Sequence, residues 1–263
     1  MGFDYLWILL AVSGVLCAVG FYKYVYFISI GYGFAVAGIG FALATMSIKG
    51  IFHTGVPHYI LFLLLIVYGL RLSSFLIIRE AKNTAYRKTL EVASRDEANM
   101  RIFVKVVIWV CVSVLYVAQT SPVFFIIYNG GKSSIVTWVG IGICTVALII
   151  ESAADRQKSK QKRIRPDMVA MGGLYKMVRC PNYFGEILFW TGVFVSSLDI
   201  LRGWGQWLTA VIAYVCIVYI MFNGAQRLEK RQMKSYANNA EYKDYADRTP
   251  IIIPFIPIYH LNK

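Results

Sequence analysis

Long apolar stretches, separated by short polar ones, run through most of the chain. Seven of them approach the roughly 20 residues that cross a bilayer as one helix, and they contain few charged residues. The pattern therefore predicts an all-α polytopic membrane protein with seven transmembrane helices in a single integral membrane domain, residues 1–263. The predicted spans are residues 5–22, 25–47, 57–79, 103–127, 134–152, 184–200 and 204–223.

The composition agrees with this class. Only 16% of the residues are charged, and the mean hydropathy is +0.57, far from the average of soluble domains. The first apolar stretch is long, is closely followed by a second, and is flanked by Asp4 instead of a basic cluster. We therefore interpret it as a membrane span and not as a cleaved signal peptide.

Basic residues are distributed unequally between the two sets of loops. One set contains only Lys49, Lys132 and Arg202, whereas residues 80–101, residues 153–181 and the tail after residue 224 contain nearly all the others. Because basic loops stay in the cytoplasm, we expect the amino terminus outside and the carboxyl terminus inside. The net charge of +13 is then explained by this asymmetry, together with a role in attracting anionic lipid or a phosphate-bearing ligand. Nucleic-acid binding is a poor explanation for it.

Further structure can be predicted for three segments that lie outside the apolar spans or extend from them. Residues 80–101 predict a short amphipathic helix on the membrane surface. The fifth span is expected to continue out of the bilayer as a helix through Lys162. The tail Ile251–Tyr259 is too short to span and contains prolines, so we expect a packed cap or an interfacial segment.

The five cysteines predict neither a disulfide framework nor a metal site. Cys17, Cys111, Cys144 and Cys216 lie in predicted spans, where a thiol behaves as a small hydrophobic group, and Cys180 lies on the cytoplasmic side.

The segment Gly172–Glu186 is the densest polar cluster at the start of an apolar helix. Asn182 and Glu186 are four residues apart and share a helix face, and Arg179 precedes them. An ionisable group at this depth usually faces a cavity or a partner. Two interpretations stay open: a structural ion pair between Arg179 and Glu186, and a site for a polar ligand.

Two further groups can carry chemistry. Glu151 and Asp155, four apart at the end of the fifth span, form either a surface pair neutralised by the lysines that follow or acceptors for a ribose or amide. In the third span, one helix face presents Tyr68, Arg71 and Arg79 toward the cytoplasm. Snorkelling explains Arg79 easily and the deeper Arg71 less easily, and pairing of Arg71 with a phosphate is the alternative.

Common nucleotide-binding and hydrolase motifs are absent. No G-x-G-x-x-G, P-loop, H-E-x-x-H or nucleophile elbow is present, and Gly31-x-Gly33 and Gly38-x-Gly40 are more typical of helix packing inside a span. A nucleotide cofactor would therefore be bound without a Rossmann domain.

With these residues assembled, the carboxyl-terminal half resembles the membrane-embedded steroid 5α-reductase family and its bacterial relatives. The resemblance extends from Glu151 to about Pro254. Its motifs are Glu151-x-x-x-Asp155-x-Gln157, Gly172-Gly173-Leu174-Tyr175, Arg179-x-Pro181-Asn182-Tyr183-x-Gly185-Glu186 followed by Trp190, and Tyr242-x-x-Tyr245 leading to Ile253-Pro254-Phe255.

The resemblance implies an NADPH-dependent reductase of a 3-oxo-Δ4 steroid or a similar lipophilic enone. It also implies an integral protein of a bacterial inner membrane or the endoplasmic reticulum, with residues 1–101 on the substrate side and residues 134–255 binding the cofactor at the cytoplasmic face. Tyr68 would donate to the substrate ketone and Glu186 would stand near the nicotinamide. The implied cofactor-binding residues are Arg71, Arg79, Glu151, Asp155, Arg179, Asn182 and Tyr236.

The chain departs from the family at two points. Eukaryotic steroid reductases pair the tyrosine with a glutamate of the second span, but here no carboxylate lies between Asp4 and Glu80. His53 or His58 is a possible substitute, although a loop histidine is more often simply solvated. Cys180 stands where many relatives have histidine after the arginine.

Two other classes of function remain open at this stage. Isoprenylcysteine carboxyl methyltransferases and phospholipid N-methyltransferases share a related arginine-proline-tyrosine-glycine pattern but bind S-adenosylmethionine. The glutamate motif upstream and Pro181-Asn182-Tyr183 with Glu186 favour the reductase. A membrane scaffold without enzymatic activity would tolerate Asn182→Ala and Glu186→Ala. No protein partner is predicted.

Overall fold

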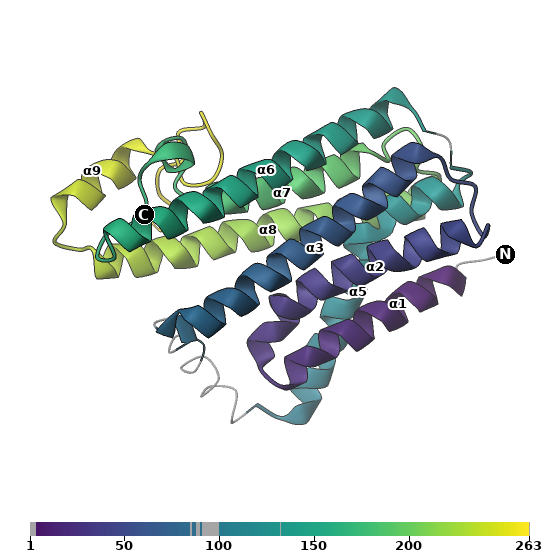
Figure 1. Ribbon diagram of the computed structural model, residues 1–263, viewed down its shortest axis with the longest axis horizontal. Coiled ribbons are helices and arrows are strands. Elements are labelled where there is room, and N and C mark those ends of the chain that lie inside the picture. The colour runs from purple at the N-terminus through teal and green to yellow at the C-terminus, as the bar shows by residue number, and fades with distance from the viewer. Residues whose placement is uncertain (1–3, 85, 88–89, 91–99, 132, 263) are drawn as a thin grey trace. The chain divides into compact units, whose positions relative to one another are not determined.

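A computed structural model describes residues 4–84, 86–87, 90, 100–131 and 133–262. All regular elements in these residues are helices (Figure 1). The chain divides into two compact units, Met1–Ile141 with Val195–Ala213 and Gly142–Phe194 with Tyr214–Lys263.

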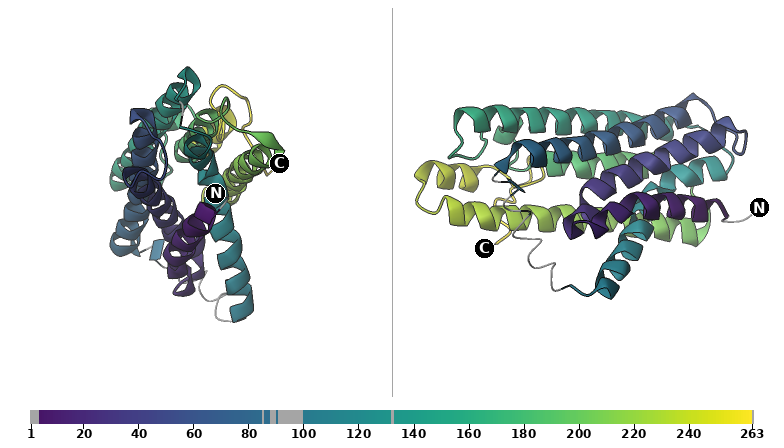
Figure 2. Two further views of the ribbon diagram at one scale, coloured as in Figure 1. Left: turned by 90° about the vertical axis from the view of Figure 1, so that its right-hand side faces the viewer. Right: turned by 60° about the horizontal axis from the view of Figure 1, so that its bottom comes forward.

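The first unit is built from four long helices. They are α1 (Asp4–Cys17), α2 (Ile30–Ile48), α3 (Val56–Lys82) and α5 (Ile102–Tyr128), and two short 3-10 helices, Ala18–Phe21 and Tyr24–Ile28, join α1 to α2. Helix α2 packs along α3 and against α1, and α5 contacts all three. Figure 2 shows that α5 crosses the other three helices at an angle.

The two halves of α5 have different surroundings. Most side chains from Ile102 to Cys111 are exposed, whereas those from Gln119 to Ile127 are buried. Exposed apolar side chains such as Phe103 and Val110 are expected where a helix faces lipid. The carboxyl-terminal half of α5 therefore forms part of the core of the first unit.

The second unit contains α7 and most of α6 and α8, followed by a short helix. Helix α6 covers Ile135–Ile164, α7 covers Pro181–Val195, α8 covers Gly203–Ser235 and α9 covers Ala240–Arg248, with a 3-10 turn at Gly173–Lys176. Helix α7 contacts α6 through Cys144, whose thiol donates to the carbonyl of Phe189, and α8 through Tyr214. The continuation of the fifth span as a helix beyond Lys162 is confirmed.

Among the described residues, six helices are long and apolar enough to cross a membrane. The span predicted at residues 184–200 is not one of them, because α7 has 15 residues and ends at Val195. At 1.5 Å per residue α7 is about 22 Å long, shorter than the roughly 30 Å hydrocarbon core. The buried Ser196 and Ser197 follow in a turn. The class of polytopic membrane protein is supported, and the count of seven is not confirmed.

The tail after α9 packs against the second unit without forming a helix. Ile251 and Ile252 are buried in a cluster with Cys180 and Ala225. The backbone N–H groups of Arg179 and Cys180 donate to the carbonyls of Pro250 and Ile251, at 2.8 and 2.9 Å. The expected packed cap is therefore present. The amphipathic helix predicted in residues 80–101 lies largely outside the described residues.

Candidate functional site

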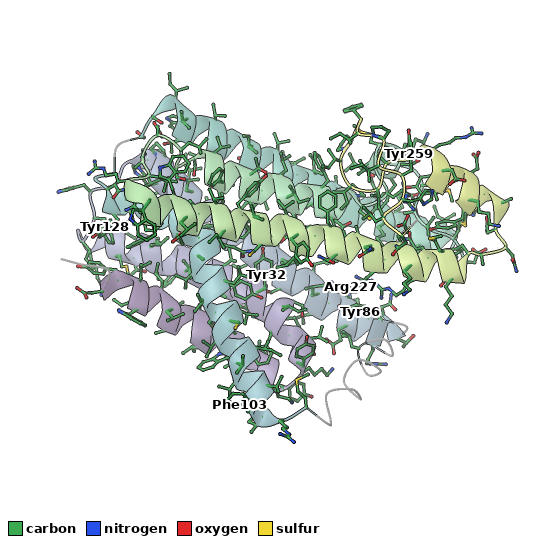
Figure 3. All side chains as sticks on the ribbon, turned by 180° about the vertical axis from the view of Figure 1, so that it is seen from behind. Tyr32, Tyr86, Phe103, Tyr128, Arg227 and Tyr259 are labelled. Atoms are coloured by element: carbon green, nitrogen blue, oxygen red, sulfur yellow. The ribbon has the colours of Figure 1, made fainter. Side chains whose placement is uncertain are left out.

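The sequence-predicted site residues fall into two groups, one in each unit. Tyr68 lies on α3 in the first unit and is fully buried. Its phenol oxygen lies 2.8 Å from that of Tyr32, a buried residue of α2 that the sequence did not single out. Figure 3 marks Tyr32 close to where α5 crosses α2. Two hydroxyl groups thus share a hydrogen bond inside an apolar unit.

The close approach of α2 and α3 explains this pair. Gly33 and Gly69, which directly follow Tyr32 and Tyr68, form the contact. A Cβ on Gly69 would lie 2.1 Å from the carbonyl oxygen of Gly33, so no side chain fits there. The Ser73 hydroxyl donates to the carbonyl of Ile30 at 2.8 Å and closes the same interface. Small residues therefore bring the two phenols within hydrogen-bonding distance.

A third tyrosine supports the pair. The ring of Tyr116 on α5 lies 4.8 Å from the ring of Tyr32, and its hydroxyl donates to the carbonyl of Phe27 at 2.9 Å. The histidines proposed as substitutes for the missing acid have other surroundings. His53 is exposed, and His58 Nδ1 accepts from the N–H of Gly55 at 2.8 Å, at the start of α3.

The other predicted residues of α3 lie toward its end. Arg71 is half-buried one turn after Tyr68. The guanidinium group of Arg79 lies over the ring of Tyr86, 4.1 Å from its centroid. The neighbouring Glu80 pairs with Lys23 at 2.5 Å, and this hydrogen bond raises the pKa of the Lys23 ammonium group. The helix thus proceeds from a buried phenol to cations, as the sequence indicated.

In the second unit, α6 and α7 meet at Glu151 and Gly185. Glu151 is 2% exposed, and a Cβ on Gly185 would lie 2.4 Å from the Glu151 Cγ atom. Figure 1 shows the two helices side by side. The contact brings Glu151 next to the first turns of α7, where the buried Glu186 directly follows Gly185. Glu151 and Gly185, which are 34 residues apart in the chain, therefore bring their two motifs together in space.

Asp155 and Asn182 flank this contact. Asp155 follows Glu151 by one turn of α6, Asn182 precedes Glu186 by one turn of α7, and both are half-buried. The side-chain amide of Asn182 makes no hydrogen bond to the residues that the structure describes. This part of the second unit therefore offers two buried or half-buried acceptors and an amide that can donate and accept.

Two glutamines on α6 fix the loop before α7. Gln157 Oε1 accepts from the N–H of Leu174, and Gln161 Oε1 accepts from those of Met171 and Gly172, each at 2.8 Å. The Gln161 amide also donates to the carbonyl of Gly172 at 3.0 Å. The glycine-rich segment of the motif set is thus fastened to the helix that carries Glu151. Gln161 was not singled out in the sequence.

Arg179 is part of a buried ion pair. Its guanidinium group lies 2.7 Å from Glu229 Oε1 on α8 and also donates to the carbonyl of Tyr259 on the tail. Glu229 further contacts His260 Nδ1 at 3.0 Å and accepts from the N–H of Leu261 at 2.8 Å. The carboxylate partner of Arg179 is therefore Glu229, 50 residues further along the chain, and the interpretation of Arg179 and Glu186 as an ion pair is wrong.

Tyr236 lies near the far end of α6. Its hydroxyl accepts from Lys162 Nζ at 3.3 Å, and its ring lies 5.3 Å from that of Tyr242. Lys162 follows Glu151 by 11 residues, or about 16 Å along the helix axis. Tyr236 and Glu151 therefore mark two ends of one face of the second unit, a separation that only an extended ligand can bridge.

The polar groups of the second unit fit the chemistry of a dinucleotide. The carboxylates of Glu151 and Asp155 can accept from ribose hydroxyls or a carboxamide, and Asn182 can donate to and accept from the same groups. Lys162 supplies a cation beside Tyr236. This donor set matches the hydroxyls, amides and phosphates of such a cofactor.

The helices and their buried polar groups define an all-helical polytopic membrane protein. A family model described as a protein of unknown function, DUF1295, matches residues 13–249. The chain belongs to the DUF1295 family. Comparison with curated proteins and with solved structures finds no match.

Proposed function

We propose that this integral membrane protein is an NADPH-dependent reductase of the steroid 5α-reductase type. Its substrate would be a 3-oxo-Δ4 steroid or a similar lipophilic enone, whose conjugated C=C bond it reduces. The DUF1295 family of membrane proteins includes steroid 5α-reductase-like members, which agrees with this proposal.

One observation carries the proposal. The contact of Gly185 with Glu151 brings together the Glu151-x-x-x-Asp155-x-Gln157 motif and the segment that bears Asn182 and Glu186. Ionisable groups gathered at this depth of a membrane protein usually mark a functional site. A dinucleotide has the hydroxyl and amide groups that such carboxylates and an amide can bind.

The tyrosine pair supplies the second half of the chemistry. When bound, NADPH supplies the hydride that adds to the β-carbon of the enone. Negative charge then develops on the carbonyl oxygen, and the Tyr68 hydroxyl is suited to donate a hydrogen bond to it before the α-carbon receives a proton. When Tyr68 donates to substrate, it accepts from Tyr32, so the phenol of Tyr32 replaces the missing acid.

The proposal includes seven membrane passes with the amino terminus outside and the carboxyl terminus in the cytoplasm. The first unit joins Asn129, after α5, to Ile200 at 2.9 Å and to Gln206 at 2.7 Å. Asn129 lies in a loop expected outside, and Ile200 and Gln206 lie at the expected outer ends of two predicted spans. If α7 did not cross, the basic tail after residue 224 would lie outside, against the positive-inside rule. Labelling single cysteines at Ser134 and Ser235 with an impermeant maleimide in sealed vesicles tests this orientation.

The cofactor is tested by ligand-induced stabilisation. The protein purified in detergent is heated with NADPH, NADH or S-adenosylmethionine, and we expect NADPH to raise the Tm. Asn182→Ala should reduce this shift. Stabilisation by S-adenosylmethionine alone would end the reductase proposal in favour of a methyltransferase. Mass analysis of progesterone or testosterone incubated with enzyme and NADPH then tests for a product two hydrogen atoms heavier.

A further inference from the structure

Gln119 is a buried amide inside the first unit. It lies on α5, three residues after Tyr116, and therefore on the same helix face about one turn further along. Gln119 is 3% exposed, and the neighbouring Thr120 and Val123 are buried as well. Tyr116 packs on Tyr32, so Gln119 lies one turn from the tyrosine cluster that includes Tyr68.

Three hydroxyl side chains close to Gln119 in the sequence donate to backbone carbonyls of α5. Ser113 donates to Trp109 at 2.7 Å, Thr120 to Tyr116 at 2.9 Å, and Ser121 to Ala118 at 2.7 Å. Gln119 differs from them. Neither its Nε2 nor its Oε1 atom has a hydrogen-bond partner among the described residues.

An unpartnered amide in this position has a high energetic cost. It is buried, and the lipid around a membrane helix offers no hydrogen bonds. The helix itself does not need the amide, because the Ala118 carbonyl, which Pro122 leaves without a backbone donor, accepts from the Ser121 hydroxyl. A leucine of similar volume would fill the same space without the penalty. The amide is therefore better explained by a ligand than by the fold.

We propose that Gln119 is a specificity-determining residue that binds a second oxygen of the substrate. This inference rests on the proposed function, because it assumes that Tyr68 holds the enone carbonyl. A carboxamide both donates and accepts, so it suits a hydroxyl or keto group on an otherwise apolar molecule. The substrate class is thereby narrowed to lipophilic enones that carry a further oxygen away from the enone.

The experiment compares two steroids on two variants. Testosterone carries a 17-hydroxyl group, and androst-4-en-3-one has the same rings and enone without it. For Gln119→Leu, we expect KM for testosterone to rise roughly tenfold and KM for androst-4-en-3-one to stay unchanged, as for a lost neutral hydrogen bond. The Tm without ligand should not fall. Ser121→Ala is the control for a change on the same helix and should leave both KM values unchanged.

The outcomes separate this inference from the proposed function. Equal effects of Gln119→Leu on both steroids, no effect on either, or a lower Tm without ligand would overturn the role of Gln119 while the reductase proposal stands. If the wild-type protein reduces neither steroid but testosterone stabilises it through Gln119, the reductase proposal fails and the binding role stands. If neither steroid is reduced or stabilises the protein, both are wrong.

Discussion

The phenol oxygens of Tyr32 and Tyr68 lie 2.8 Å apart, and no acidic side chain lies between Asp4 and Glu80 in the sequence. One hydroxyl must donate to the other, and the hydroxyl that accepts has a proton of its own to donate in turn. Hydrogen bonds in such a chain strengthen each other in a medium of low dielectric constant. The pair can therefore polarise a carbonyl without introducing a charge into the membrane interior.

Removing each phenol should have a different effect. Tyr68→Phe should lower kcat for enone reduction on the order of 100-fold with little change in KM for NADPH, because the hydrogen bond is strongest in the transition state. Tyr32→Phe acts through Tyr68 and should lower kcat about tenfold. Steady-state kinetics with varied enone and varied NADPH measure both effects.

Tyr116→Phe is the matched control for the tyrosine pair. Its hydroxyl bonds the backbone of Phe27, so its loss should lower the Tm while kcat stays close to the wild-type value. Equal losses of kcat in all three variants would show that the cluster acts through packing alone.

The α6–α7 contact gives a second prediction. Gly185→Ala would place a methyl group 2.4 Å from the Glu151 Cγ atom, so the helices must separate or Glu151 must move. We expect a loss of about 1–3 kcal/mol in the free energy of unfolding and weaker stabilisation by NADPH.

Gly142→Ala on α6 is the control for Gly185→Ala, because nothing lies within 4 Å of its added methyl group. That change should be neutral or stabilising by up to about 1 kcal/mol. Identical thermal unfolding of the two variants would contradict the close contact.

The helices could be predicted from the sequence because bilayer thickness sets a length that apolar stretches must reach. The prediction of a span up to residue 200 was wrong about the end of α7, which ends at Val195, just before the polar Ser196, Ser197 and Asp199. The packing role of Gly33 was predicted, but its consequence for Tyr32 depends on the facing Gly69.

The partners of the site residues were harder to predict. The four-residue spacing of Glu151 and Asp155 placed both carboxylates on one helix face, but spacing within a helix does not identify the residue across the interface. The partner of Arg179 is Glu229, which lies on another helix and is one of four acidic residues after residue 224. A buried carboxylate among exposed ones has no signature in a single sequence.

The ion pair of Arg179 and Glu229 should contribute mainly to stability. Arg179→Ala leaves a buried carboxylate without its cation, and a loss of about 3–5 kcal/mol in the free energy of unfolding is expected. Glu229→Ala also removes the anchor of His260 and Leu261, so trypsin should cut sooner after the exposed Arg248. Unfolding in detergent and timed proteolysis measure these effects.

An exposed ion pair provides the control for these variants. Arg165 contacts Glu241 at 2.8 Å, and both side chains are about half exposed. Arg165→Ala should change neither the Tm nor the rate of proteolysis measurably. If Arg179→Ala behaves in the same way, the Arg179–Glu229 pair is not buried in solution.

Cys180 is expected to be unreactive in the folded protein. It is 3% exposed, and burial raises the pKa of its thiol from 9.0 to about 12. At pH 7.5 the fraction of molecules with Cys180 in the thiolate form is then on the order of 1 in 10,000 or less. N-ethylmaleimide should therefore leave Cys180 unlabelled until the protein is unfolded.

The raised pKa of Cys180 also makes the stability of the protein depend on pH. Because the pKa of this thiol is higher in the folded state than in the unfolded state, the folded state holds the proton more tightly. The associated stability is complete below pH 9 and is lost as the pH rises from about 9 toward 12. Peptide mapping after labelling distinguishes Cys180 from the exposed Cys111. Rapid labelling of folded Cys180 would show that the tail segment around Ile251 does not cover it.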